Sequence, residues 1–276
     1  MNFLLKAAVL AAAALLVSLP ASAQQKYEPQ VGQAGKDVIW VPTPDEVVDR
    51  MLRMAQVTKD DFVVDLGAGD GKIAIAAAKK FGARSLGIEY NADMAKHAQA
   101  NVEKNGVAAR AKIVQGDIFA SDFTQATVVT MYLLPALNMK LRPQILQMRP
   151  GTRVVSHSFT MEDWEPDETS SMDGRRAYFW LVPANVMGSW TLEAAGEKRE
   201  LSLEQKFQKI DGSVAFGTTQ AGLRDTRLRG FVISFAYVDQ AGLRRDYTGR
   251  VLAGGRMEGS WKTDNGAEGR WTAVKK

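Results

Sequence analysis

Short apolar runs alternate with helical periods between residues 62 and 158, and this alternation restricts the chain to few folds. Buried parallel strands are apolar on both faces, and the helices that connect them cover both sides of the sheet. Strands are predicted at 62–66, 84–89, 111–115, 127–132 and 153–158, and helices at 72–81, 91–105 and 136–148. The pattern therefore predicts an α/β fold with a doubly wound, mostly parallel sheet.

A further helix is expected in front of the first strand. In the stretch "WVPTPDEVVDRMLRMAQV", Thr43 has the residue type of an N-cap and Pro44 would occupy the first helical position. Glu46 follows three residues after this cap, as in a capping box. The apolar residues that come next recur on one helical face, so we expect this helix to cover the sheet.

The periodicity changes near residue 170. Asp173 and Gly174 stand between two extended runs, which is typical of a hairpin that completes the sheet with a final antiparallel strand. After Val186 the chain consists of short alternating segments separated by turn residues, as in an antiparallel meander or a small barrel. We therefore predict an α/β domain over residues 37–185 and a small all-β domain over 186–276, for which no ligand is predicted.

The first residues have the features of an export signal. Lys6 precedes an apolar run, and Ala21-Ser22-Ala23 has the small-x-small pattern of a cleavage site. We predict a signal peptide over 1–23, a flexible leader over 24–36, and a periplasmic or secreted mature protein without a membrane span. An uncleaved membrane anchor is the alternative, although the apolar run is short against the ~20 residues of a typical span.

Composition excludes several kinds of site. The chain contains no cysteine, which rules out disulfides, thiolate metal ligands and a cysteine nucleophile. Its 35 basic and 31 acidic residues are spread along the chain, whereas a nucleic-acid partner would call for a concentrated basic patch. The two histidines, His97 and His157, do not form a metal-binding motif. We therefore predict neither a nucleic-acid partner nor a metal.

The stretch "VVDLGAGDGK" places Gly67, Gly69 and Gly71 in the first strand-to-helix turn. Parallel sheets bind ligands at this edge, where glycine allows close approach and a helix N-terminus offers free N–H groups. A turn that needs glycine only for its dihedral angles is the structural alternative. A dinucleotide fingerprint has its third glycine three positions after the second, and Gly71 comes one position too early for that.

With Asp65 in front of the first glycine, the run D-x-G-x-G-x-G resembles the signature of class I S-adenosylmethionine-dependent methyltransferases. The resemblance implies that Asp65 faces the ammonium of the cofactor, whereas a pyrophosphate would gain nothing from an acid. Glu89 ends the second strand, where an acidic side chain binds a ribose diol, and Asp117 resembles the residue that reads the adenine amino group. Both could instead be solvated loop carboxylates. The predicted cofactor contacts are Asp65, Gly67, Ala68, Gly69, Gly71, Glu89, Tyr90, Asp117 and Ile118.

The resemblance covers residues 40–184 and extends to a branch of the class. The stretches "WVPTPDEVVDRML", "TMYLLPALN" and "RVVSHSF" are similar to bacterial relatives of protein-lysine methyltransferases. That group includes the enzyme of the mitochondrial ATP synthase c-subunit and histone enzymes of the telomeric-silencing type. It implies in-line methyl transfer to a nucleophile, with a protein lysine as one candidate acceptor. "MYLLP" replaces the acidic-aromatic motif of DNA and RNA amino methyltransferases, which disfavours an amino base as acceptor.

Three residues are predicted to serve catalysis at the same sheet edge. Tyr132 would begin an apolar mouth at the end of the fourth strand, with Asn138 one helical turn further on. A desolvating mouth of this kind would favour the uncharged form of a lysine acceptor. His157 ends the fifth strand and could act as a general base. The alternative for His157 is a structural hydrogen bond within its loop.

Two other functions compete with methyl transfer. The first is a binding protein that holds a nucleoside without turnover and uses its all-β domain to hold a partner. The predicted export favours this alternative, because the methyl donor is made in the cytosol. An oxidoreductase that uses NAD would also fit a glycine turn followed by an acid.

Overall fold

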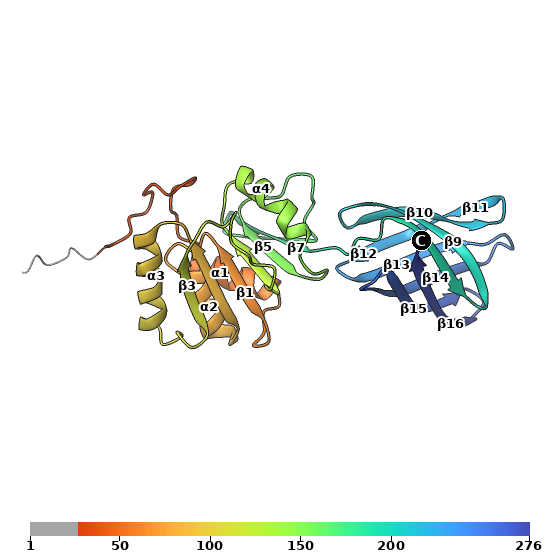
Figure 1. Ribbon diagram of the computed structural model, residues 1–276, viewed down its shortest axis with the longest axis horizontal. Helices are drawn as coiled ribbons and strands as arrows, with labels where there is room; N and C mark the ends of the chain where they lie inside the picture. The colour runs from red at the N-terminus through yellow and green to blue at the C-terminus, as the bar shows by residue number, and fades with distance from the viewer. Residues whose placement is uncertain (1–26) are drawn as a thin grey trace, which may run out of the picture.

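The computed structural model describes residues 27–276, which form two sheets arranged end to end (Figure 1). The first sheet has seven strands in the order β3-β2-β1-β4-β5-β7-β6. The first five strands run parallel, whereas β7 is antiparallel to both β5 and β6. The strands are β1 Phe62–Leu66, β2 Arg84–Glu89, β3 Ala111–Gln115, β4 Val128–Met131, β5 Arg153–His157, β6 Glu168–Met172 and β7 Arg175–Leu181.

Helices cover both faces of this sheet. Successive residues of a strand point to opposite faces, so Val63 packs under α1 and α2 while Val64 packs under α4. Helix α3 packs on the side of α2, against Ala111 and Ile113 of β3. The predicted doubly wound α/β core is therefore present. The helices are α1 Asp45–Met54, α2 Lys72–Phe81, α3 Ala92–Lys104 and α4 Pro135–Leu146.

A hairpin completes the edge of the sheet, as predicted. Its strand β7 is antiparallel to β5, whereas β6 pairs along the outer side of β7 and so runs in the same direction as β5. Asp173 and Gly174 make the predicted hairpin turn between them, with φ angles of 48° and 76°. Positive φ at both central residues matches the right-handed twist of the paired strands.

The remaining nine strands form one antiparallel sheet that curls into a nearly closed barrel (Figure 1). Strands β10 and β12 meet across the seam, where the Leu223 N–H donates to the Gly212 carbonyl at 2.9 Å. The strands are β8 Gly188–Ala194, β9 Glu197–Lys206, β10 Lys209–Phe216, β11 Thr219–Gly222, β12 Arg224–Arg229, β13 Val232–Val238, β14 Arg244–Leu252, β15 Arg256–Thr263 and β16 Glu268–Lys275.

Aromatic side chains fill the interior of the barrel. Trp190 and Trp271 are almost fully buried, and each indole N–H donates to a main-chain carbonyl. Phe235 stacks on Tyr247 with ring centroids 4.9 Å apart, and the Tyr247 hydroxyl bonds that of Tyr237 at 2.9 Å. The interior of the barrel is therefore a packed hydrophobic core.

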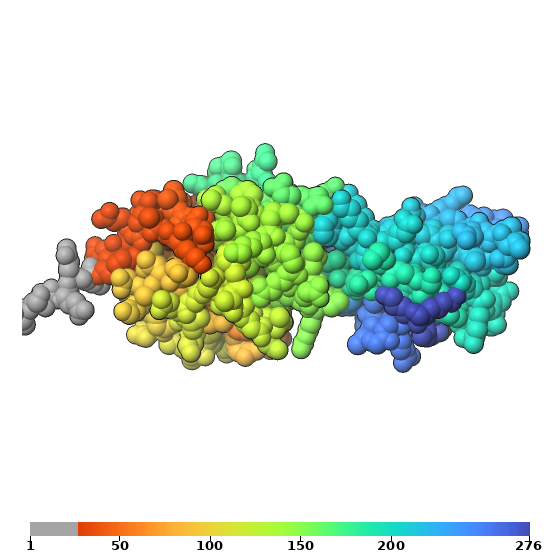
Figure 2. Space-filling model, turned by 45° about the horizontal axis from the view of Figure 1, so that its top comes forward, coloured from red at the N-terminus to blue at the C-terminus, as the bar shows by residue number. Residues whose placement is uncertain are grey.

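The segment in front of α1 departs from two expectations. The flexible leader was expected to extend to residue 36, yet residues 32–40 fold back on themselves through bonds from the Gly32 N–H to the Trp40 carbonyl and from the Trp40 N–H to Gln33. Figure 2 shows this segment, in red and orange, packed against the α/β half. The expectation that Thr43 caps α1 is also wrong, because the helix begins at Asp45 and its N-cap, Pro44, makes no side-chain bond.

The predicted signal peptide, and the membrane anchor that competes with it, lie outside the described residues. Between residues 27 and 276, none of the helices combines the length and the apolar character that a membrane crossing needs.

Candidate active site

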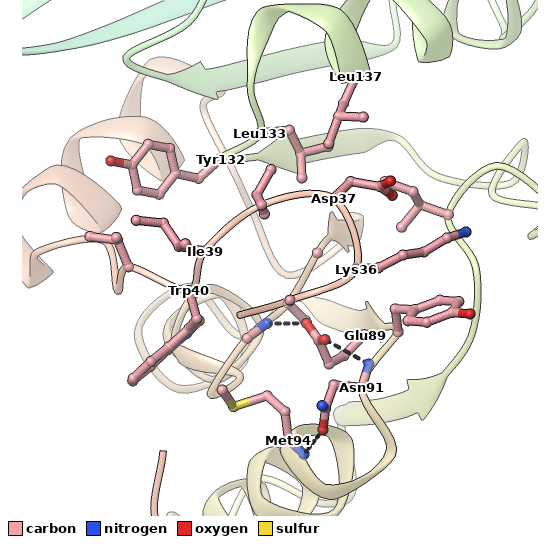
Figure 3. A pocket seen from close by; sticks show the side chains of 18 of the residues that line it. Lys36, Asp37, Ile39, Trp40, Glu89, Asn91, Met94, Tyr132, Leu133 and Leu137 are labelled. Carbon is pink, nitrogen blue, oxygen red and sulfur yellow. Dashed lines mark hydrogen bonds between the residues drawn. The ribbon is translucent and has the colours of Figure 1, made fainter. Parts of the chain in front are cut away.

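A cavity of about 320 Å³ opens at the carboxyl ends of β1, β2 and β4 (Figure 3). The glycine turn forms its floor, and the ends of the neighbouring strands form its walls. Residues 33–43 cover it from the other side. This is the edge at which a doubly wound sheet binds ligands. All predicted cofactor contacts except Gly71 line the cavity: Asp65, Gly67, Ala68, Gly69, Glu89, Tyr90, Asp117 and Ile118.

The glycine turn is shaped as a cradle with no room for side chains. Gly69 has a φ of 54°, and a Cβ atom built on it would lie 2.6 Å from the indole nitrogen of Trp40. A Cβ atom on Gly67 would lie 3.0 Å from Leu133. Gly71 packs beneath the turn against Ala98, so its role is structural. Glycine is therefore needed here for conformation and for space.

Asp65 is a buried carboxylate without a cation beside it among the described residues. It is 2% exposed, and the Thr130 hydroxyl donates to its Oδ1 at 2.7 Å. Burial raises the pKa of Asp65 to about 7, and the nearby carboxylates of Asp70 and Glu89 add to the rise. A buried carboxylate of this kind is stabilised when a cationic ligand supplies the missing charge.

Glu89 lies at the centre of the cavity and fixes the loops on either side (Figure 3). Its Oε2 accepts the Gly69 N–H at 2.9 Å, and its Oε1 accepts the Asn91 N–H at 2.9 Å. A carboxylate has about four lone-pair positions. Two positions therefore remain for the hydroxyls of a ribose.

Asp117 stands at the far wall of the cavity and is paired with the leader. Its Oδ2 accepts a bond from Lys36 Nζ at 2.8 Å, and its Oδ1 accepts the Phe119 N–H at 2.9 Å. The hydrogen bond from Lys36 holds the pKa of Asp117 below its usual range. The Lys36 ammonium also lies 4.5 Å from the ring centroid of Tyr90. An adenine amino group would have to share Asp117 with this lysine.

The cover over the cavity was missed at the sequence level. Trp40 lies over Gly69, and Ile39 and Lys36 extend along the opening (Figure 3). The signal available in the sequence is a tryptophan directly before the "VPTP" stretch that leads into α1. A local pattern could not reveal a contact with a turn about thirty residues away.

Of the three predicted catalytic residues, Tyr132 alone lines the cavity. Tyr132 lines it together with Phe159, and the two rings are stacked with centroids 6.1 Å apart. His157 lies behind Tyr132, with ring centroids 4.0 Å apart, and does not line the cavity. Its Nδ1 is 3.2 Å from the Thr43 hydroxyl, which explains why Thr43 does not cap α1.

His157 is neutral at physiological pH. It is 3% exposed, and burial lowers its pKa to about 4, with the positive charge of Arg175 contributing. A group with this pKa is a weak proton acceptor near pH 7, because an efficient general base has a pKa close to the working pH. The structure therefore favours a structural role for His157, although its hydrogen-bond partner is Thr43 and not a residue of its own loop.

Asn138 is not at the mouth of the cavity, which corrects the expected position. Its side chain is fully buried, and its Nδ2 donates to the Thr160 carbonyl at 3.1 Å and to the Phe159 carbonyl at 3.4 Å. The residue projects from α4 toward the loop that follows β5, as these two bonds show. It holds that loop from behind.

The cavity matches one kind of ligand. Among the described residues, a buried acid, Asp65, lacks a cation, and a second acid, Glu89, accepts two main-chain N–H groups and keeps free acceptor positions. S-adenosylmethionine carries a sulfonium, an ammonium and a ribose diol, which fit these features, whereas the pyrophosphate of NAD would be repelled by Asp65. The residues present therefore fit this cofactor, and the fold and the site together define a class I methyltransferase that uses S-adenosylmethionine.

Comparisons with known proteins agree with this class. The family model of the ANTKMT methyltransferase domain matches residues 65–168. A protein-lysine N-methyltransferase of Saccharolobus islandicus is 49% identical over 138 residues, which cover 49% of this chain and 86% of that protein. The mouse enzyme that methylates a lysine of the ATP synthase c-subunit is 30% identical over 132 residues. That match covers 48% of this chain but only 53% of the mouse enzyme.

A solved structure extends the agreement to the cofactor. An RNA methyltransferase from Salinibacter ruber, in complex with S-adenosyl-L-homocysteine, shares 50% identity with a TM-score of 0.52. The match covers 53% of this chain and 96% of that one. The chain thus belongs to the class I S-adenosylmethionine-dependent methyltransferases, among the relatives of the ATP synthase c-subunit lysine methyltransferase.

The position of Trp40 leads to a first prediction. Trp40→Ala is expected to speed dissociation of S-adenosylhomocysteine about tenfold, because part of an aromatic cover over the ligand is lost. Stopped-flow displacement measures this rate. Val31→Ala is the matched control, since Val31 belongs to the same segment and does not line the cavity. An unchanged dissociation rate in Trp40→Ala would contradict the prediction, because it would show that the indole does not retain the ligand in the cavity.

Proposed function

We propose that this methyltransferase transfers its methyl group to a lysine amine of a protein. The observation that carries the proposal is the apolar character of the cavity mouth. Leu134 and Ile39 line it while remaining 44% and 62% exposed, beside Tyr132 and Phe159. Exposed apolar side chains that cluster at a cleft are typical of a binding surface. The two protein-lysine methyltransferases named above support the same acceptor class.

The mouth suits the chemistry of an amine. A free lysine has a pKa of about 10.4 and must lose its proton before it can attack. An apolar mouth disfavours the charged form of an amine, and the neutral imidazole of His157 adds no charge there. We propose that Tyr132 contacts the acceptor and that His157 and Asn138 position its surroundings.

The cofactor supplies an electrophilic methyl group on a sulfonium when it is bound. The task left to the chain is alignment and exclusion of water, because the sulfonium charge disperses in an in-line displacement. Asp65 would hold the ammonium of the cofactor and Glu89 its ribose, and the aromatic wall would direct the amine.

We also propose that the protein works in the periplasm or outside the cell. The apolar run and the Ala21-Ser22-Ala23 site support export. Mass spectrometry of the mature N-terminus tests this, with Gln24 as the expected first residue. A protein that retains Met1 would contradict it and would favour the membrane anchor.

Labelled cofactor tests the acceptor. The mature protein is incubated with S-adenosylmethionine labelled on its methyl group and with an envelope extract, and the products are digested with protease or with ribonuclease. We expect label in protein that is lost on protease treatment and found as methyl-lysine. Label that is lost on ribonuclease treatment would point to RNA, the class named for the Salinibacter ruber enzyme. Cofactor binding without turnover would contradict the proposal.

A further inference from the structure

One turn of the barrel inserts into the α/β half. Phe207, between β9 and β10, packs against the hydrophobic core that lies under α4. Its ring stacks on Trp164, with centroids 5.9 Å apart and planes 23° from parallel. Trp164 is fully buried and follows β5 in the α/β half. The barrel thus contributes an aromatic side chain to the packing of the other half.

The turn that carries Phe207 is held in a defined shape. Phe207 has a φ of 54°, a strained conformation that a residue with a side chain rarely adopts. The Gln205 amide compensates, because its Nε2 donates to the Phe207 carbonyl at 2.6 Å and to the Ala184 carbonyl at 2.8 Å. Its Oε1 accepts the Val186 N–H at 2.7 Å. The turn is therefore tied to the segment that joins the two halves.

Polar contacts extend the same interface. Lys209 Nζ lies 2.7 Å from the Glu165 carboxylate, and the Gln208 amide donates to the Glu165 carbonyl at 2.7 Å. Lys206 Nζ lies 3.2 Å from Asp163. All three contacts join the β9–β10 turn to a single segment, the loop of residues 158–165 that follows β5.

Helix α4 holds this loop from its other side. Arg142 donates to the Met161 carbonyl at 3.0 Å and to Asp163 at 2.6 Å. Its guanidinium lies 5.2 Å from the ring centroid of Phe207. Phe207 therefore contacts both the loop, at Trp164, and the helix that holds the loop, at Arg142. Asn138 binds the first part of the same loop through the Phe159 and Thr160 carbonyls. The loop is clamped between α4 and the barrel.

The clamped loop forms part of the cavity wall. Phe159 lies within it, lines the cavity and stacks on Tyr132. Phe207 therefore contacts Trp164, within the loop that carries Phe159, and Arg142, which holds the same loop at Met161 and Asp163. The carboxylates that would hold the cofactor lie on other strands, outside these contacts.

We propose that the barrel braces the wall on the acceptor side of the active site, with Phe207 as a positioning residue. The brace itself rests on contacts between the two halves, and its effect on the acceptor rests on the proposed function. Loss of the Phe207 ring should loosen the loop and impair methyl transfer while leaving the cofactor site intact. The family model ends at residue 168, before the barrel begins, so the brace is a feature that this chain adds to the methyltransferase core.

Hydrogen exchange on the full chain tests the brace directly. In Phe207→Ala, amides of residues 158–165 should exchange about tenfold faster, because local opening becomes easier where packing is lost. Amides of β1 and β2 should be unaffected, and the affinity for S-adenosylhomocysteine should stay within about twofold by calorimetry. Phe207→Tyr keeps the ring and should restore slow exchange. Unchanged exchange in residues 158–165 of Phe207→Ala would overturn the brace.

Phe231→Ala is the matched control. Phe231 belongs to the barrel and contacts the α/β half at Gly151, away from the loop, so its loss should leave exchange at 158–165 unchanged. Equal acceleration in both variants would mean that docking of the barrel in general supports the loop, which would overturn the specific role of Phe207.

Turnover with the envelope extract provides the second measurement. We expect Phe207→Ala to lower methyl transfer at saturating cofactor about tenfold, with recovery in Phe207→Tyr. A loosened loop with full activity would overturn the positioning role. If the wild-type protein transfers no methyl group to the extract, the proposed function fails, while the exchange data still decide whether the barrel braces the loop.

Discussion

Asp65→Asn is expected to remove most of the affinity for S-adenosylmethionine and, at the same time, to stabilise the protein without cofactor at pH 8. The carboxylate is buried without a cation, and its pKa is raised from 3.8 to about 7. That rise corresponds to a cost of up to about 4 kcal/mol for the ionised form in the folded state. The uncharged amide avoids this cost, and its oxygen can still accept the bond from Thr130.

The direction of the pH dependence follows from the raised pKa. Between about pH 4 and pH 7 the folded protein keeps a proton on Asp65 that the unfolded chain has released. The free energy of unfolding without cofactor should therefore fall as the pH rises through this range, and Asp65→Asn should lack that fall. Binding of the cationic cofactor needs the ionised acid, so wild-type affinity should weaken about tenfold for each pH unit below 7.

Thermal unfolding and calorimetry from pH 5 to pH 8 measure both effects. Asp93→Asn is a suitable control, because Asp93 is exposed on α3 and does not line the cavity. Equal cofactor affinity in Asp65→Asn and wild type would remove the electrostatic basis of the site.

Glu89→Gln is expected to weaken cofactor binding about 100-fold, although the side chain keeps its size. Both carboxylate oxygens accept main-chain N–H groups, at Gly69 and at Asn91. A glutamine has one acceptor oxygen, so its amide nitrogen would face an N–H donor and leave it without a partner. The change therefore disturbs the glycine turn and also removes the charged acceptor for the ribose.

Calorimetry with S-adenosylhomocysteine measures the loss, and Glu103→Gln on the exposed side of α3 serves as the control. Adenosine competition adds a sharper comparison, since Glu89→Gln should reduce adenosine affinity while Asp65→Asn should leave it nearly unchanged. Equal losses of adenosine affinity in both variants would contradict the assignment of Asp65 to the ammonium and of Glu89 to the ribose of the cofactor.

The sequence was sufficient for the core of the α/β half. Strands β1, β2 and β3 and helix α2 occupy the residues predicted for them, because alternating apolar runs and glycine caps are local signals. The predicted cofactor contacts also gather at one cavity, since the carboxyl ends of parallel strands share one edge of the sheet. The parallel direction and the order of the strands are enough to bring these residues together, whatever the conformations of their side chains.

Contacts between distant segments could not be read in the same way. Thr43 has the residue type of a helix cap, yet its hydroxyl lies beside His157. Asn138 lies one helical turn beyond the mouth in the sequence, and helical spacing predicts the face of the helix that a residue occupies. It does not predict how deeply the residue is buried, and Asn138 is fully buried. Trp40 covers a turn about thirty residues away, and no local period records that contact.

Taken alone, the sequence determined the order of elements, the glycine cradle and the acids at the ends of two neighbouring strands, because each depends on residues close together in the chain. Only the tertiary structure decided which side chains face the cavity, that burial leaves His157 neutral, and that Phe207 of the barrel reaches the loop beside the active site. Those outcomes depend on packing and desolvation, which arise when segments far apart in the chain meet.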